Sequence, residues 1–136
     1  MANITMSPTL KTARAQVIVT QAGATAFLSI YTGVMPSDPS ITSGIGSQIV
    51  ALPMSNPIGV VSAGTLTLSA ITQTNATLAG TNTAVFARIQ TSATAGIAGI
   101  VDLDVAVTGA SLDINSTSVT LGGPVAVTAS GTFAEQ

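Results

Sequence analysis

The chain has 136 residues, a length typical of one domain, so residues 1–136 are expected to fold as a single unit. Charged residues make up 6% of the chain, against roughly a quarter in a typical soluble domain, and the formal net charge is −2. Three cations cannot form a basic stripe, which argues against a nucleic-acid partner. Free monomers usually stay soluble through mixed surface charge, so we infer that other subunits cover much of this surface.

The N-terminal part predicts a short arm followed by one amphipathic helix. The arm covers residues 1–6 and the helix residues 7–22, because Ser7 is a good N-cap, Pro8 suits the first turn and Gly23 suits the C-terminal end. A β-branched run inside this segment favours a strand instead. At helical spacing the predicted inward-facing residues are Leu10, Ala13, Val17 and Ile18.

The sequence pattern of residues 26–133 predicts short strands separated by turn residues, and it contains no internal repeat. The expected strands are 26–31, 47–52, 65–71, 83–91, 97–107, 111–114 and 124–132. Their number and spacing predict a mainly β fold, an antiparallel β-sandwich or jelly-roll-like domain, with one N-terminal α-helix. Several strands alternate apolar residues with Thr or Ser. The lysines that normally protect edge strands are nearly absent, so neighbouring subunits are expected to cover the edges.

A long exposed loop is expected at residues 35–46, where proline, glycine and serine are frequent and no hydrophobic period is present. Such a loop has little to bury within its own domain, so it is free to contact a neighbour. The N-terminal arm also lacks an obvious place in the core. The candidate intersubunit contacts in these two segments are Asn3, Met6, Met35, Ser37, Asp38 and Ser43.

The residue inventory argues against an enzyme and against any cofactor. The chain has no His and no Cys, so the usual general base, the thiolate nucleophile and the commonest zinc ligands are all missing. No apolar run approaches the roughly 20 residues that cross a bilayer, and no cleaved signal peptide is expected. The four aromatic residues are too few for sugar or base stacking and are expected in the core: Phe27, Tyr31, Phe86 and Phe133.

Three carboxylates lie close together in the sequence. Asp102 and Asp104 share one face of a predicted strand, and Asp113 follows a turn. One interpretation is a weak site for a hard cation such as calcium, held by Asp102 and Asp104. The simpler interpretation is that one of these two carboxylates pairs with Arg88 on an adjacent strand, or faces water, and we prefer it because an EF-hand loop is absent.

Several segments follow one another in an order typical of a known family. After the predicted helix come Gly23-Ala24-Thr25, Phe27-Leu28-Ser29-Ile30-Tyr31 and Thr32-Gly33-Val34-Met35-Pro36. Later segments are Val85-Phe86-Ala87-Arg88-Ile89, Gly99-Ile100-Val101-Asp102-Leu103-Asp104-Val105, Gly109-Ala110-Ser111-Leu112-Asp113-Ile114-Asn115-Ser116-Thr117-Ser118-Val119 and Gly122-Gly123-Pro124-Val125. Over most of its length the chain resembles a family of small virion structural proteins of tailed bacteriophages. It differs from members of this family in the β-branched residues within its predicted helix and in its much less charged surface.

The resemblance implies a capsid decoration or cement protein, a small jelly-roll or sandwich that bridges major capsid subunits. Its expected partners are the major capsid protein and copies of itself, as a dimer or trimer, and its expected location is the capsid surface after synthesis in the host cytoplasm. Two alternatives stay open. One is a head–tail junction or tail-associated subunit, and the other is a carbohydrate-binding or adhesive β module, against which the scarcity of Tyr and the absence of Trp count.

Overall fold

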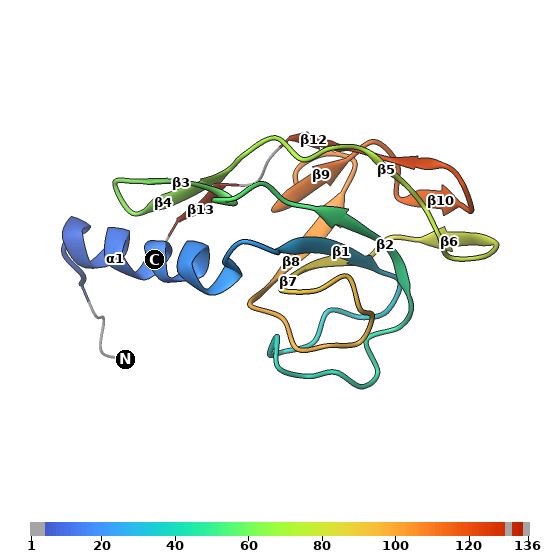
Figure 1. Ribbon diagram of the computed structural model, residues 1–136, viewed down its shortest axis with the longest axis horizontal. Helices are drawn as coiled ribbons and strands as arrows, with labels where there is room; N and C mark the ends of the chain where they lie inside the picture. Colours follow the sequence, from blue (N-terminus) through green and yellow to red (C-terminus); the bar gives the residue numbers. More distant parts are fainter. Residues whose placement is uncertain (1–4, 130–131, 135–136) are drawn as a thin grey trace.

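The computed structural model describes residues 5–129 and 132–134, which form a mainly β fold with one helix (Figure 1). The helix is α1 (Pro8–Ala22). The strands are β1 (Phe27–Tyr31), β2 (Gln48–Pro53), β3 (Gly59–Ser62), β4 (Thr65–Leu68), β5 (Thr74–Asn75), β6 (Thr81–Thr83), β7 (Phe86–Gln90), β8 (Val101–Ala106), β9 (Leu112–Ile114), β10 (Ser118–Thr120), β11 (Pro124–Val125), β12 (Val127–Ala129) and β13 (Thr132–Ala134).

The main sheet has six strands in the order β12-β9-β8-β7-β1-β2 and is curled. Its pairs are antiparallel except β8 with β9, which run parallel, so the prediction of a purely antiparallel sheet is wrong at this pair. Parallel neighbours usually need a long crossover. Here a short loop suffices because only the last two residues of β8 pair with the first two of β9. Two carboxylates fix the loop: Asp113 accepts from the N–H groups of Gly109 and Ala110, and Asp104 accepts from Ser111.

The remaining strands form a three-stranded sheet, β13-β4-β3, and two short pairs, β10-β6 and β11-β5. Strands β3, β5 and β10 lie outside the predicted runs. Three predicted strands are shorter than expected: the run 65–71 ends at Leu68, the run 83–91 is reduced to Phe86–Gln90, and the run 97–107 begins at Val101. The run 124–132 is divided between β11 and β12.

Helix α1 has the predicted ends but a different buried face. The Ser7 hydroxyl accepts a hydrogen bond from Leu10 N, and Gly23 ends the helix at a φ of 65°. The buried residues are Ala15, Val19 and Ala22. Leu10 and Val17 are 48% and 55% exposed and Ala13 is also exposed, whereas Ile18 is half-buried, so the predicted inward face is largely wrong.

The helix buries its small-residue face because the β3–β4 hairpin approaches it closely (Figure 1). At the hairpin turn, Gly64 N donates to the Thr12 hydroxyl over 2.9 Å. A Cβ at Gly64 would lie 2.8 Å from the Cβ of Lys11, closer than real side chains pack. Ala15 and Ala22 permit this short separation where larger side chains would hold the two elements apart.

The two faces of the main sheet are buried in different ways. Leu28, Ile30, Ala87 and Ile89 project from one face into the main hydrophobic cluster. The other face carries polar side chains, among them Arg88 and Gln90 of β7. Every residue of β7 is in fact buried, because the loops 32–47 and 91–100 lie over that face, below β1 and β7 in Figure 1.

Candidate functional site

The polar face of the main sheet centres on Arg88, which lies in the middle of β7 and is fully buried. Its cross-strand neighbour on β8 is Asp102. The guanidinium donates to both carboxylate oxygens, from Nε over 2.7 Å and from Nη2 over 2.9 Å. This bidentate geometry is the strongest form of such a pair. The structure therefore pairs Arg88 with Asp102 and not with Asp104.

The third nitrogen of Arg88 fastens both covering loops to the sheet. Nη1 donates to the carbonyl oxygen of Ile41 over 2.8 Å and to that of Ile97 over 3.0 Å. The two loops also bond to each other, since Gly99 N donates to the carbonyl of Pro39 over 2.9 Å. A Cβ at Gly99 would overlap the side-chain carbons of Arg88, so the 91–100 loop needs glycine at this position to close over the guanidinium.

A second polar group on the same face holds the 91–100 loop. The Tyr31 hydroxyl donates to Gln90 Oε1 over 3.0 Å and accepts from Gly96 N. Gln90 Nε2 donates to the carbonyls of Ser92 and Thr94 over 2.7 and 2.8 Å. Gln90 is fully buried and bonded at both ends, so it fixes the start of the 91–100 loop.

Apolar contacts add a second anchor between the 32–47 loop and the sheet. Ile45 is buried in a small cluster with Tyr31 and Phe86, separate from the main core. The two aromatic rings stack with centroids 5.2 Å apart, and the Arg88 guanidinium carbon lies 5.9 Å from the centroid of Phe86. Residue 45 lies close to the start of the loop at Gly33, where an added Cβ would overlap the backbone of Ile45. Backbone and side chain thus hold this loop in one conformation.

The carboxylates proposed as a weak cation site have other roles in the structure. Asp102 is bound to Arg88, whereas Asp104 accepts from the backbone and the hydroxyl of Ser111. The hydrogen bond from the Ser111 hydroxyl lowers the pKa of Asp104, against a smaller opposing effect of burial. Within residues 5–129 and 132–134, no three acidic side chains gather in a way that would hold a metal ion.

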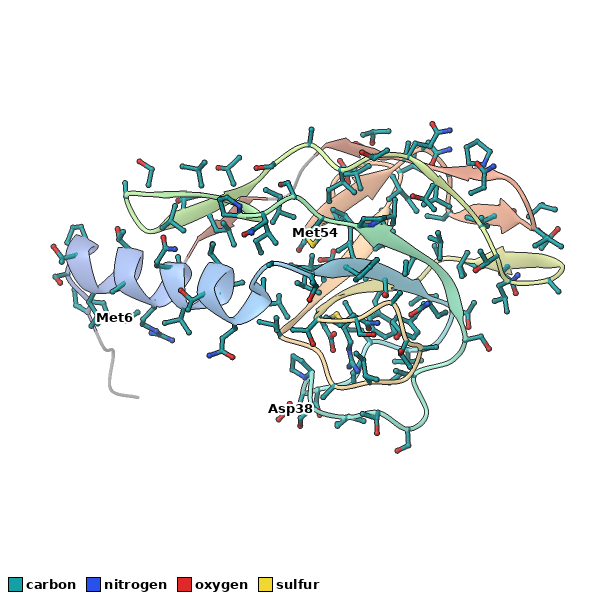
Figure 2. All side chains as sticks on the ribbon, in the orientation of Figure 1. Met6, Asp38 and Met54 are labelled. Carbon is teal, nitrogen blue, oxygen red and sulfur yellow. The ribbon has the colours of Figure 1, made fainter. Side chains whose placement is uncertain are left out.

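The six candidate contact residues lie in two parts of the molecule. Asn3 is outside the described residues. Met6 is half-buried at the start of α1, beside Arg14, and Figure 2 shows it well apart from Asp38 on the 32–47 loop. Met35 is 42% exposed, and the polar members of the set are exposed on the same loop: Ser37, Asp38 and Ser43.

The 32–47 loop also exposes apolar side chains that were not among the candidate contact residues predicted from the sequence. Val34 is 78% exposed and Ile41 is exposed as well, so with Met35 three apolar side chains of this loop face outward. The contact residues predicted from the sequence include Met35 but not Val34 or Ile41. Their signal is weak in the sequence, because an apolar residue in an irregular stretch gives no period from which burial can be inferred.

Comparisons with known proteins give no relative: no family model, no curated protein and no solved structure matches this chain. In the part of the chain that the structure describes, no helix is both long enough and apolar enough to span a membrane. The described residues also enclose no pocket. What the geometry defines is a buried polar network that fixes two loops, one of which presents apolar side chains.

Proposed function

We propose that this protein is a structural virion subunit of a tailed bacteriophage that binds and stabilises the capsid lattice, as a decoration or cement protein. The observation that carries the proposal is the 32–47 loop. Arg88 and Ile45 anchor the loop to the sheet, while the side chains of Val34, Met35 and Ile41 are exposed. Single exposed apolar residues are common, but three on one anchored loop suit a protein contact.

A preformed loop binds at lower entropic cost than a flexible one, because its conformation is already fixed before the partner arrives. The low charge of the chain supports the same function, since Thr, Ser and Ala surfaces lose less on desolvation than Lys or Glu surfaces. A subunit that binds only the assembled lattice shifts the equilibrium toward it, and the effect multiplies over many copies.

The proposal includes a finer architecture and a set of partners. The smaller sheets serve as the second layer of a sandwich or jelly roll over the apolar face of the main sheet. The partners are the major capsid protein and further copies of this chain, and the location is the capsid surface. The protein acts without catalysis or cofactor, through packing alone.

The test is binding of the purified chain to capsids that lack it, followed by co-sedimentation. Met35→Asp places a charge on the exposed side of the loop and is expected to reduce binding at least tenfold without lowering thermal stability. The matched control is Val107→Asp, at an apolar position that is also exposed but lies on the β8–β9 loop. If both variants bind as the wild type does, the loop is not a contact surface. If the wild type itself fails to bind capsids, the capsid proposal is wrong.

A further inference from the structure

Strand β3 lies at one end of the three-stranded sheet β13-β4-β3. In Figure 1 the β3–β4 hairpin extends beside α1, away from the main sheet. Its turn is Ala63-Gly64, and the positive φ angles of these two residues, 51° and 79°, indicate a two-residue type I′ turn. In such a hairpin the pair next to the turn, Ser62 with Thr65, exchanges backbone hydrogen bonds.

The hydrogen-bond pattern along β3 leaves the backbone of Val61 facing outward. Its neighbours Val60 and Ser62 bond to β4, so the N–H and C=O of Val61 point away from that strand. Within residues 5–129 and 132–134, no other strand pairs with this edge and neither of these two groups has a hydrogen-bond partner. The outer edge of β3 is therefore an open template for another strand.

The edge has none of the features that usually keep other strands away. Edge strands are commonly protected by lysine, proline or an inward-facing charge, and β3 contains none of these. Val60 is 66% exposed, and Ser62 is exposed on the same face of the strand. No charged residue occurs between residues 39 and 87. Lys11 packs on this hairpin, but it does so at the turn, against Gly64.

We propose that β3 pairs antiparallel with β3 of a second copy, about a two-fold axis near Val60 and Val61. Each Val61 then supplies one donor and one acceptor to the partner strand, and the two three-stranded sheets join into one sheet of six strands. The two Val60 side chains lie on the same face of that sheet, on either side of the axis. The two turns lie at opposite ends of the contact, which separates the two Lys11 side chains.

The absence of charge favours a second copy as the occupant of this edge. A two-fold contact places each residue near its own counterpart, so any charge on the edge would face a like charge. A strand from a different protein imposes no such condition, and matching charges are then a common source of specificity. The inference gives a surface to the self-contact within the proposed function, and it rests on that function only for the expectation that copies of this chain meet.

The first measurement is the oligomeric state of the purified full chain by sedimentation velocity. A short strand pair buries less than the roughly 1,000 Å² of a stable complex, so a weak dimer is expected. Monomer should convert to dimer as the concentration rises to about 1 mM. Over the same range the exchange of the Val61 amide is expected to slow several-fold, whereas the Val60 amide, which bonds to β4, stays slow throughout.

Charge at Val60 makes the test specific for a two-fold contact. Val60→Lys and Val60→Asp each place like charges on both sides of the axis, so each variant alone is expected to stay monomeric. An equimolar mixture sets Lys beside Asp and is expected to dimerise, which would also establish that both variants are folded. The matched control is Val17→Lys, at a valine that is 55% exposed on the side of α1 opposite its buried face, and it is expected to dimerise as the wild type does.

Four results would overturn the inference: a wild type that is monomeric at about 1 mM, a Val60 variant that dimerises alone, a monomeric mixture, or a Val61 amide whose exchange does not change with concentration. These outcomes are separable from the fate of the capsid proposal. A monomeric chain that still binds capsids removes the β3 pairing alone. A chain that dimerises through β3 but does not bind capsids removes the capsid proposal and leaves the pairing standing.

Discussion

Replacing Arg88 by alanine tests the buried network at its centre. The substitution leaves the Asp102 carboxylate, whose side chain is 5% exposed, without its bidentate partner. Removing one member of a buried ion pair typically costs about 3–5 kcal/mol, since the remaining charge stays desolvated. Domains of this kind are stable by about 5–15 kcal/mol, so the expected loss is a large fraction of the total.

The assay is urea denaturation with linear extrapolation, supported by thermal unfolding. At about 2–4 °C per kcal/mol for a domain near this size, Arg88→Ala is expected to lower Tm by roughly 10 °C. A loss of free energy below about 1 kcal/mol would refute the reasoning, because it would mean that the charge of Asp102 is not buried with Arg88 in solution.

A double variant separates burial of charge from anchoring of the loops. Arg88→Met with Asp102→Leu removes both charges, so it is expected to recover most of the lost stability. It also removes the donor to the carbonyls of Ile41 and Ile97. Amide hydrogen exchange in the 32–47 and 91–100 loops is therefore expected to be faster than in the wild type even where global stability is restored. Unchanged exchange would show that Arg88 does not hold the loops.

Three further predictions concern single side chains. The Ser29 hydroxyl is buried on β1 without a hydrogen-bond partner among the described residues, so Ser29→Ala is expected to be neutral or to stabilise by about 1 kcal/mol in urea denaturation. Gly99→Ala places a Cβ against the Arg88 side chain and is expected to cost about 1–3 kcal/mol in the same assay. Folding lowers the pKa of Asp104, chiefly through the Ser111 hydroxyl, so its stabilising contribution is present above about pH 4 and is lost as the pH falls through the folded-state pKa. Asp104→Asn is expected to flatten this part of the stability–pH profile.

Each of these three predictions has a contradicting result. Destabilisation of Ser29→Ala by more than about 1 kcal/mol would mean that the hydroxyl has a partner in solution. Gly99→Ala is compared with Ala98→Ser, an exposed neighbour expected to be neutral, and equal stability of the two variants would contradict the close packing on Arg88. If the stability of Asp104→Asn falls as steeply at acid pH as that of the wild type, Asp104 is not the group responsible for that fall.

Some of the fold follows from local sequence rules. Ser7, Pro8 and Gly23 predict both ends of α1, because capping is a property of a few adjacent residues. The β-branched run that favours a strand does not prevent the helix, since packing against β3 and β4 outweighs a propensity of a few tenths of a kcal/mol per residue. Which face of α1 is buried could not be read from periodicity, because Ala15, Val19 and Ala22 form a second face at the same spacing.

The candidate site was only partly predictable. A lone arginine among apolar residues in a strand indicates an internal acidic partner, but choosing between Asp102 and Asp104 requires the strand register. Burial of β7 on both faces depends on loops distant in sequence, which the alternation of apolar and polar residues along the strand does not indicate. The parallel pairing of β8 with β9 was missed because a short turn between two strands usually indicates an antiparallel hairpin, whereas here only the end of β8 pairs with the start of β9.

The most direct test of the proposed function is the copy number of this chain in purified virions, measured by quantitative mass spectrometry against the major capsid protein. The account predicts a simple ratio to the shell subunit, as expected for a protein that occupies the lattice. A number fitting the neck or tail would move the chain to the head–tail junction or the tail. Absence of the chain from purified particles would contradict a structural role in the virion.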